Sequence, residues 1–312
     1  MRTQWVDWEE AWRDALYGSS GFVHTGEAPV LHFRTSVHVG TVLADALAEL
    51  LDRTDHALGR PQVLDLVDLG AGGGELLSAM VDIAGAPLRR RLRPSAVDLR
   101  PAPTQWQLPW LAQLPERVTG LVIAHEWLDA IPCPVVQHDG NDARRMEVSA
   151  DGTERLGVAL SGPGLAWLRR WWPLADGERA EVGLHRDRAW QQVLRHMDAG
   201  AALAVDYGHL RTERPCAGTL AAYRHGRQVR PVPDASCDLT AHVSLDSLAA
   251  LAPGVHTTQA EALDNLGARE QPQLGSWLRQ AVRTGQIAEL TDPAGFGGFG
   301  WVLHPTNIDL PL

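Results

Sequence analysis

Three glycines at alternate positions follow a short apolar run and precede a helical stretch. They are Gly70, Gly72 and Gly74, in the segment VDLGAGGGELL. Glycine adopts positive φ angles and leaves room for a ligand to approach the main chain. An acid, Asp68, stands just before this turn, and a second acid, Asp98, lies near the end of the next apolar segment. In an open α/β sheet, ligands bind where strands deliver their carboxyl ends into loops, so this turn is a candidate binding site.

The spacing of the glycines distinguishes two classes of ligand. A dinucleotide fingerprint, G-x-G-x-x-G, would need glycine at position 75, where the chain has Glu75. The pattern D-x-G-x-G-x-G that begins at Asp68 is instead similar to that of class I S-adenosylmethionine (SAM) methyltransferases. A tight strand–helix turn with no ligand is the alternative.

The resemblance implies that SAM is the cofactor, with Asp68 near its methionine ammonium. By the logic of the ribose-binding acid in nucleotide folds, Asp98 would accept hydrogen bonds from its ribose hydroxyls. The expected cofactor-binding residues are Asp68, Gly70, Ala71, Gly72, Gly74, Asp98, Leu99 and His125.

Polar residues also follow two other apolar runs. Glu126 and Asp129 come after LVIAH, and Asp206 and Tyr207 lie in ALAVDYG. Methyl transfer from SAM depends mainly on positioning, and it needs a base only if the acceptor is protonated. Two carboxylates could hold the planar guanidinium of an arginine by charge-assisted hydrogen bonds. We therefore take these four residues as catalytic candidates. In the alternative, Glu126 caps a helix, Asp129 anchors a loop and the other two are structural.

Strand-like and helical patterns alternate along the segments that position these residues. Apolar residues recur at helical spacing from Val39 to Leu50, which predicts a helix that ends near Gly59. Short apolar runs read as buried strands at 63–70, 95–99, 121–125 and 202–208. Such alternation is typical of a parallel sheet covered on both faces. The expected fold is α/β, Rossmann-like, of the class I SAM methyltransferase type, with a mostly parallel seven-stranded sheet.

Two regions differ from this alternation. Residues 1–60 carry helical patterns, including tryptophans at helical spacing, and are expected to form a helical segment packed on the core. Residues 134–160 carry D-G and N-D turn signals between alternating segments, which predict a β-rich insertion. The methyltransferase domain is expected over residues 61–312, interrupted by that insertion.

A longer resemblance runs through several segments in the same order. HEWLDAIPCPVVQ is similar to the (N/H)-E-F-F-D-A-L-P-V motif of the MidA-type family, whose mitochondrial members assist respiratory complex I assembly as protein arginine methyltransferases. HFRTS, VDLGAGGGELL, VDYGH, GTLAAYRHGRQV and DLTAHV resemble the family's G-D-F-x-T-S, E-L-G-P-G-x-G-x-L, I-D-Y-G, G-T-L-R-x-Y and D-L-T-A-H-V. The resemblance spans roughly residues 20–305 and implies a protein arginine as acceptor. The chain departs from the family where Val37-His38 replace the usual Pro-Glu, so no role is carried over for that carboxylate.

Composition excludes several other classes of function. A net charge of -10 argues against a general nucleic-acid binder, which needs a positive field. Three cysteines without C-x-x-C spacing suggest neither a zinc site nor disulfides, and His24, His32 and His38 lack the spacing of a metal site. No signal peptide or membrane span is evident, so the expected location is the cytoplasm.

Fold and cofactor do not choose the methyl acceptor, so three functions remain open. The first is a protein arginine methyltransferase. The second is a small-molecule N- or O-methyltransferase, and the third is an assembly factor that binds SAM without catalysis. The partner is therefore a protein or a small molecule. His242, in DLTAHV, could be a proton acceptor or a substrate contact, or simply a structural histidine.

Overall fold

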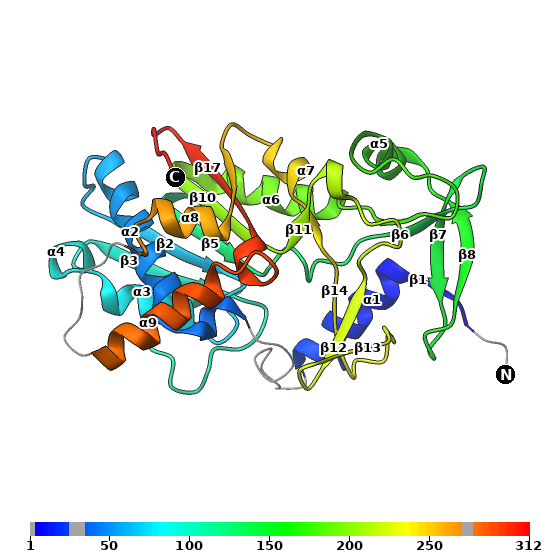
Figure 1. Cartoon of the computed structure of the whole chain (residues 1–312), viewed down its shortest axis with the longest axis horizontal. Helices are drawn as coiled ribbons and strands as arrows, with labels where there is room; N and C mark the ends of the chain where they lie inside the picture. The colour runs from blue at the N-terminus through cyan, green and yellow to red at the C-terminus, as the bar shows by residue number, and fades with distance from the viewer. Residues whose placement is uncertain (1–3, 25–34, 270–276) are drawn as a thin grey trace. The chain divides into compact units, whose positions relative to one another are not determined.

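The computed structural model describes residues 4–24, 35–269 and 277–312, and Figure 1 shows its helices and strands. Residue contacts divide the chain into two compact units. Unit 1 comprises Met1–Arg34, Leu128–Trp190 and Gly208–Leu251. Unit 2 comprises Thr35–Trp127, Gln191–Tyr207 and Ala252–Leu312. The first 60 residues contribute to both units, and the expected boundary at residue 60 stays a prediction.

Unit 2 is built on a seven-stranded sheet with the order β16-β17-β10-β5-β2-β3-β4. The strands are β2 (Leu64–Leu69), β3 (Leu92–Val97), β4 (Trp110–Leu111), β5 (Val118–His125), β10 (Met197–Asp206), β16 (Val255–Thr258) and β17 (Gly300–Thr306). The four runs that read as buried strands in the sequence correspond to β2, β3, β5 and β10. The turn after β2 therefore lies at the carboxyl edge of this sheet.

The sheet is mixed, which corrects the expectation of a mostly parallel one. The strands from β10 to β4 pair in parallel, whereas β17 runs antiparallel to both β10 and β16. The physical reason lies in where the chain enters β17. The chain leaves β16 at Thr258 and enters β17 at Gly300, and these two residues are partners in the sheet. Two neighbouring strands joined at the same edge must run in opposite directions.

Helix α2 (Val42–Ala57) anchors the core of unit 2. Its buried leucines, among them Leu43, Leu47 and Leu50, pack in one cluster with residues of β2, β5 and β10. Burying a leucine side chain contributes about 1.5–3 kcal/mol to the stability of the fold. The leucines that recur at helical spacing in the sequence are therefore the residues that pack α2 against the sheet. The other helical segments of unit 2 are η3 (Ser36–Val39), α3 (Glu75–Ile83), α4 (Ala86–Arg89), α8 (Gln259–Asn265), α9 (Trp277–Leu290) and η5 (Phe296–Gly298).

Unit 1 contains an antiparallel five-stranded sheet, in which β8 pairs with β7 beside the path β1-β7-β6-β9. Its strands are β1 (Val6–Asp7), β6 (Val135–His138), β7 (Ala143–Val148), β8 (Glu154–Ala159) and β9 (Arg179–Glu181). Three of them fall within residues 134–160, where the sequence predicts β-rich structure. The strands β1 and β9, from outside that range, complete the sheet, so residues 134–160 form only part of it.

The first helix, α1 (Trp8–Tyr17), belongs to unit 1. The Asp7 side chain caps it by accepting a hydrogen bond from the Glu9 amide. Trp8 and Trp12 are buried in a cluster that also holds residues of β7 and β14, and the Trp12 indole donates to the Leu239 carbonyl. The tryptophan spacing of the sequence is therefore a packing pattern.

The remaining elements of unit 1 are short, apart from the helices α5 (Gly162–Trp171) and α6 (Leu184–His196). The short elements are η1 (Phe22–His24), β11 (Gly208–His209), η4 (Arg211–Glu213), β12 (Ala221–Arg224), β13 (Arg227–Val229), β14 (Asp238–Thr240), β15 (Val243–Ser244) and α7 (Leu245–Ala249). Helix α6 begins in unit 1 and continues into unit 2. Among the described residues no helix is both long and apolar enough to cross a membrane.

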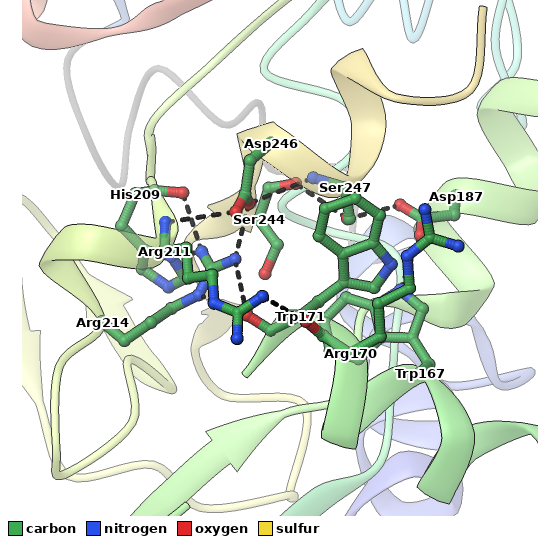
Figure 2. Close-up of polar contacts among 10 residues, drawn as sticks. All are labelled: Trp167, Arg170, Trp171, Asp187, His209, Arg211, Arg214, Ser244, Asp246 and Ser247. Atoms are coloured by element: carbon green, nitrogen blue, oxygen red, sulfur yellow. Dashed lines mark hydrogen bonds and ion pairs between the residues drawn. The ribbon is translucent and has the colours of Figure 1, made fainter. Parts of the chain in front are cut away.

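A polar network joins α5, α7 and the segment after β11 within unit 1, as Figure 2 shows. Arg214 contacts the Asp246 carboxylate and donates to the carbonyls of Trp171 and His209. Asp187 accepts hydrogen bonds from the Trp167 indole and the Ser247 hydroxyl, and burial raises the pKa of Asp187 to about 6. These bonds satisfy buried polar groups and tie the elements together.

Candidate functional site

The turn after β2 holds three glycines in the left-handed region. Their φ angles are 75° at Gly70, 60° at Gly72 and 82° at Gly74. Residues with a Cβ atom rarely adopt such angles. A Cβ added to Gly72 would meet no atom within 4 Å. The main chain at Gly72 is therefore open to a ligand.

Two tryptophans pack on the other two glycines. A Cβ on Gly70 would lie 2.6 Å from Cδ1 of Trp127, and a Cβ on Gly74 would lie 2.2 Å from Cζ3 of Trp106. Both rings thus rest directly on the main chain of the turn, which fixes its shape around the open position. These tryptophans could not be singled out from the sequence, because no local pattern links them to the turn.

Asp68, the next-to-last residue of β2, has an unused hydrogen-bond acceptor just before this turn. Only 4% of the residue is exposed, and among the described residues its Oδ2 atom has no hydrogen-bond partner. Burial raises the pKa of Asp68 to about 7; the Leu77 amide opposes this shift, while the nearby acids Asp98 and Glu75 add to it. Leaving a buried acceptor unpaired is costly, so a cationic or hydrogen-bond-donating ligand group would be favoured here.

Asp98 lies beside the glycine turn, as the sequence analysis expects. Its Oδ2 atom accepts a hydrogen bond from the Gly72 amide at 2.9 Å, and its Oδ1 atom accepts one from the Arg100 amide at 2.8 Å. The next residue, Leu99, is 67% exposed, which is unusual for a large apolar side chain in this protein. An apolar ligand surface would cover it. The neighbouring Ala71, in contrast, is buried.

Glu126 follows β5 at the same edge of the sheet in an uncommon conformation. Its φ is 49°, and such an angle in a residue with a side chain costs about 1–3 kcal/mol, a cost found mostly at functional sites. Its amide donates to the Val205 carbonyl on the neighbouring β10 at 2.8 Å. Along the chain β6 comes next, so Glu126 does not cap a helix. The capping alternative is therefore wrong.

The Glu126 side chain is 7% exposed and contacts two residues of unit 2. Its Oε1 atom accepts a hydrogen bond from the Ser36 amide at 3.3 Å and lies 3.6 Å from Nδ1 of His125. The Nε2 atom of His125 lies 2.7 Å from the Ser36 hydroxyl. Burial lowers the pKa of His125 to about 4, and nearby His38 adds to this shift, so the imidazole is neutral at pH 7. Its cofactor contact remains a prediction.

The Ser36 contacts were not foreseen, although the sequence analysis quoted HFRTS as a motif. The last two residues of that segment, Thr35 and Ser36, are described by the structure, while the first three residues, including His32, lie outside the described ranges. The spacing of Ser36 and His38 gives no local signal that Ser36 contacts His125 and Glu126, which lie about 90 positions further along the chain.

Asp206 is the last residue of β10, the parallel neighbour of β5, and Tyr207 follows it. Val205 of β10 pairs with His125 of β5. The residues that follow Val205 and the residues that follow His125 therefore emerge at the same edge of the sheet. Asp206 is buried, and the Tyr207 ring meets the Phe299 ring edge-on at 5.4 Å between centroids. The structure thus places Glu126, Asp206 and Tyr207 at the carboxyl edge that also carries the glycine turn.

Asp129 belongs to unit 1 and has a structural role there. Its Oδ2 atom accepts a hydrogen bond from the Thr240 hydroxyl at 2.7 Å. Its carbonyl accepts bonds from the Arg186 guanidinium and the Ala241 amide. These contacts support the alternative in which Asp129 anchors a loop. Because Glu126 belongs to unit 2, a carboxylate pair formed by the two stays a prediction.

The site offers carboxylates and main-chain groups but no cluster of metal ligands. In the parts of the chain that the structure describes, no group of three or more histidine, cysteine, aspartate or glutamate residues could hold a metal ion. The edge of the sheet carries a buried carboxylate at Glu126, a neutral imidazole at His125 and the open glycine turn.

Comparison with known proteins identifies the family and the fold of the chain. Residues 43–261 match the family described as "Putative S-adenosyl-L-methionine-dependent methyltransferase". A crystal structure of a COG1565 superfamily member from Burkholderia thailandensis, bound to S-adenosyl-homocysteine, is similar with a TM-score of 0.84 and 21% identity, covering 98% of this chain and 89% of that one. A native structure of a COG1565 superfamily protein from the same organism has a TM-score of 0.82 and 22% identity, covering 98% and 88%. At this identity the likeness shows a common fold. No curated protein matches the chain.

Proposed function

We propose, from the premise that this chain belongs to the S-adenosyl-L-methionine-dependent methyltransferase family, that it transfers the methyl group of SAM to a protein arginine. The observation that carries the proposal is the buried carboxylate of Glu126, held at a left-handed φ where β5 ends. The finer assignment to the MidA-type family rests on the motifs of the sequence and is part of the same proposal.

The residues present at the glycine turn fit SAM. Asp68 has an unused buried acceptor suited to the methionine ammonium. Gly72 leaves the main chain open, and Asp98 stands beside it with a carboxylate suited to a ribose diol. Leu99 is exposed where an adenine ring would cover it. When bound, SAM supplies an electrophilic methyl group on a sulfonium, and these residues hold and orient it.

Glu126 gives the site its means of activating an acceptor. An arginine has a pKa above about 12, so its nitrogens are poor nucleophiles while the charge is spread over the guanidinium. A carboxylate that binds one side of the group draws the positive charge toward itself and leaves the far nitrogen more nucleophilic. Glu126 also accepts the proton that the methylated nitrogen releases. Asp206 and Tyr207 lie at the same edge and would line the acceptor site.

A small-molecule acceptor is the second candidate, and an aromatic group favours it. The Phe299 ring contacts both the Tyr207 ring and the Phe296 ring in unit 2, with Tyr207 at the carboxyl edge of the sheet. Aromatic side chains at that edge could enclose a planar molecule.

A labelling experiment separates these candidates. The purified protein and methyl-labelled SAM are incubated with a lysate from a strain that lacks the gene, and labelled protein is hydrolysed for amino-acid analysis. We expect label in methylarginine. Label found only in small molecules would support the second candidate instead. No label in any fraction, from a protein that binds SAM, would indicate a non-catalytic assembly factor.

Asp98→Ala should weaken the binding of S-adenosylhomocysteine (SAH) by roughly 1–3 kcal/mol, the scale of a lost charge-assisted acceptor. The substitution also removes the bond to the Gly72 amide, so the turn loses a support. Calorimetry measures the affinity. Asp82→Ala, which removes an exposed acid from α3, is the matched control and should bind SAH as the wild type does. Equal affinity in all three proteins would contradict the ribose role.

The binding of SAH should become weaker as the pH falls below about 7. The pKa of Asp68 is raised to about 7 in the ligand-free protein, chiefly by burial, with Asp98 and Glu75 adding to the shift. An ammonium beside Asp68 favours the ionised carboxylate, so ligand binding lowers this pKa and releases a proton. The affinity should therefore fall by up to about tenfold per pH unit below pH 7.

Calorimetry in two buffers with different ionisation enthalpies tests this linkage. Near pH 6.5 the observed enthalpy should depend on the buffer and report proton release. Asp68→Asn should remove that dependence. Proton uptake by the wild type, or an affinity that does not change between about pH 5.5 and 7.5, would show that Asp68 does not contact the ammonium.

A further inference from the structure

Ser36 makes two contacts with the group at the end of β5. The residue is fully buried and begins η3, just after Thr35. Its amide donates to Oε1 of Glu126 at 3.3 Å, and its hydroxyl lies 2.7 Å from Nε2 of His125. One serine thus reaches both residues that end the strand, although it lies about 90 positions away in the sequence.

The surroundings of His125 determine which ring nitrogen carries the proton. Nδ1 lies 3.6 Å from Oε1 of Glu126, where a lone pair would face a carboxylate and be repelled. This distance favours a proton on Nδ1, which would place its positive end toward the carboxylate. Nε2 is then an acceptor, so the Ser36 hydroxyl donates to it. Free neutral histidine in water prefers the opposite tautomer, with the proton on Nε2, which makes this assignment distinctive.

We infer that Ser36 is a positioning residue for Glu126, which it holds directly through its amide and indirectly through the hydroxyl bond that orients His125. The inference rests on the proposed function, in which Glu126 acts on the acceptor. A glutamate side chain has three rotatable bonds, and fixing it in one geometry before the acceptor arrives lowers the entropy cost of the reaction. The two contacts provide that fixing from one side of the carboxylate.

The neutrality of the imidazole is part of this arrangement. Burial lowers the pKa of His125 to about 4, and His38 adds to the shift. A neutral ring with a fixed tautomer presents a dipole to Glu126 without neutralising its charge. Glu126 therefore keeps the negative charge that an acceptor guanidinium needs, and His125 serves as an orienting group that does not take the proton.

The tautomer can be measured by long-range ¹H–¹⁵N NMR on the ¹⁵N-labelled full-length protein. His125→Asn identifies the signals of His125 by their disappearance. In the wild type we expect a neutral ring protonated at Nδ1 between about pH 5.5 and 8, since its pKa lies below that range. Ser36→Ala should shift the ring toward the Nε2–H tautomer. Ser78→Ala, which alters an exposed serine on α3, should leave the signals unchanged.

The rate of label transfer provides the second readout. Ser36→Ala should lower the rate into lysate protein about tenfold, the size expected for one lost hydrogen bond, and should change SAH affinity much less. Ser36→Thr keeps the hydroxyl and should recover most of the rate. An Nε2–H tautomer in the wild type, or an unchanged rate of label transfer in Ser36→Ala, would overturn the inference.

Failure of the proposed function gives a different result. In that case the wild type shows the Nδ1–H tautomer and loses it in Ser36→Ala, but transfers no label to protein. The contact between Ser36 and His125 would then stand, while the positioning role would fall together with the role of Glu126.

Discussion

Glu126→Gln is expected to lower the rate of label transfer from SAM to protein by about 100-fold or more, the usual contribution of a positioned acid–base group. Glutamine keeps the size of the side chain and much of its hydrogen bonding but removes the charge. Without that charge the acceptor guanidinium keeps its positive charge spread over three nitrogens, and none becomes a good nucleophile. SAH affinity should stay nearly intact, because the interaction is felt mainly in the transition state.

Two further variants give this prediction its controls. Glu49→Gln changes an acid on α2 that pairs with Arg53 at the surface, and it should leave the rate unchanged. Asp129→Asn should have a smaller effect than Glu126→Gln, because the Asp129 carboxylate already accepts a bond from Thr240. A Glu126→Gln protein that transfers label at the wild-type rate would remove Glu126 from the mechanism.

Gly72→Val should abolish detectable SAH binding. Gly72 has a φ of 60° and open space where a Cβ would project. A valine there would fill the space that a ligand needs against the main chain, and its branched side chain would strain the turn. Calorimetry should show at least about a 100-fold loss of affinity, the scale of removing several contacts at once.

Gly59→Val separates the two effects of that substitution. Gly59 also belongs to unit 2, has a φ of 73° and has no atom within 4 Å of an added Cβ. The strain from a positive φ is therefore similar, but the site lies after α2 and away from the glycine turn. We expect a loss of thermal stability with SAH binding retained. Loss of binding in both variants would attribute the effect to general destabilisation.

Local patterns in the sequence were enough to predict where several candidate site residues lie, while their roles stay predictions. The glycine turn and Asp68 are adjacent in the chain, and Asp98 follows from the rule that neighbouring parallel strands end at one edge. The bond between Asp98 and the Gly72 amide is consistent with that rule. Glu126 was found in the same way, since it directly follows a buried strand.

Contacts between distant segments were not predictable from one sequence. Trp106 and Trp127 pack on the turn because of the way the loops after β3 and β5 fold back, and no spacing encodes this. The helical patterns of residues 1–60 look alike, yet α1 packs in unit 1 and α2 in unit 2. A helical pattern shows which face is apolar but not which core receives it. The antiparallel direction of β17 depends likewise on where the chain re-enters the sheet.

Diffraction from crystals of this protein soaked with SAH would test the central claim most directly. We expect electron density for SAH against Gly72, with its ammonium at Asp68, its ribose hydroxyls at Asp98 and its sulfur facing the edge where Glu126 lies. Density elsewhere, or a sulfur atom that points away from Glu126, would contradict the account.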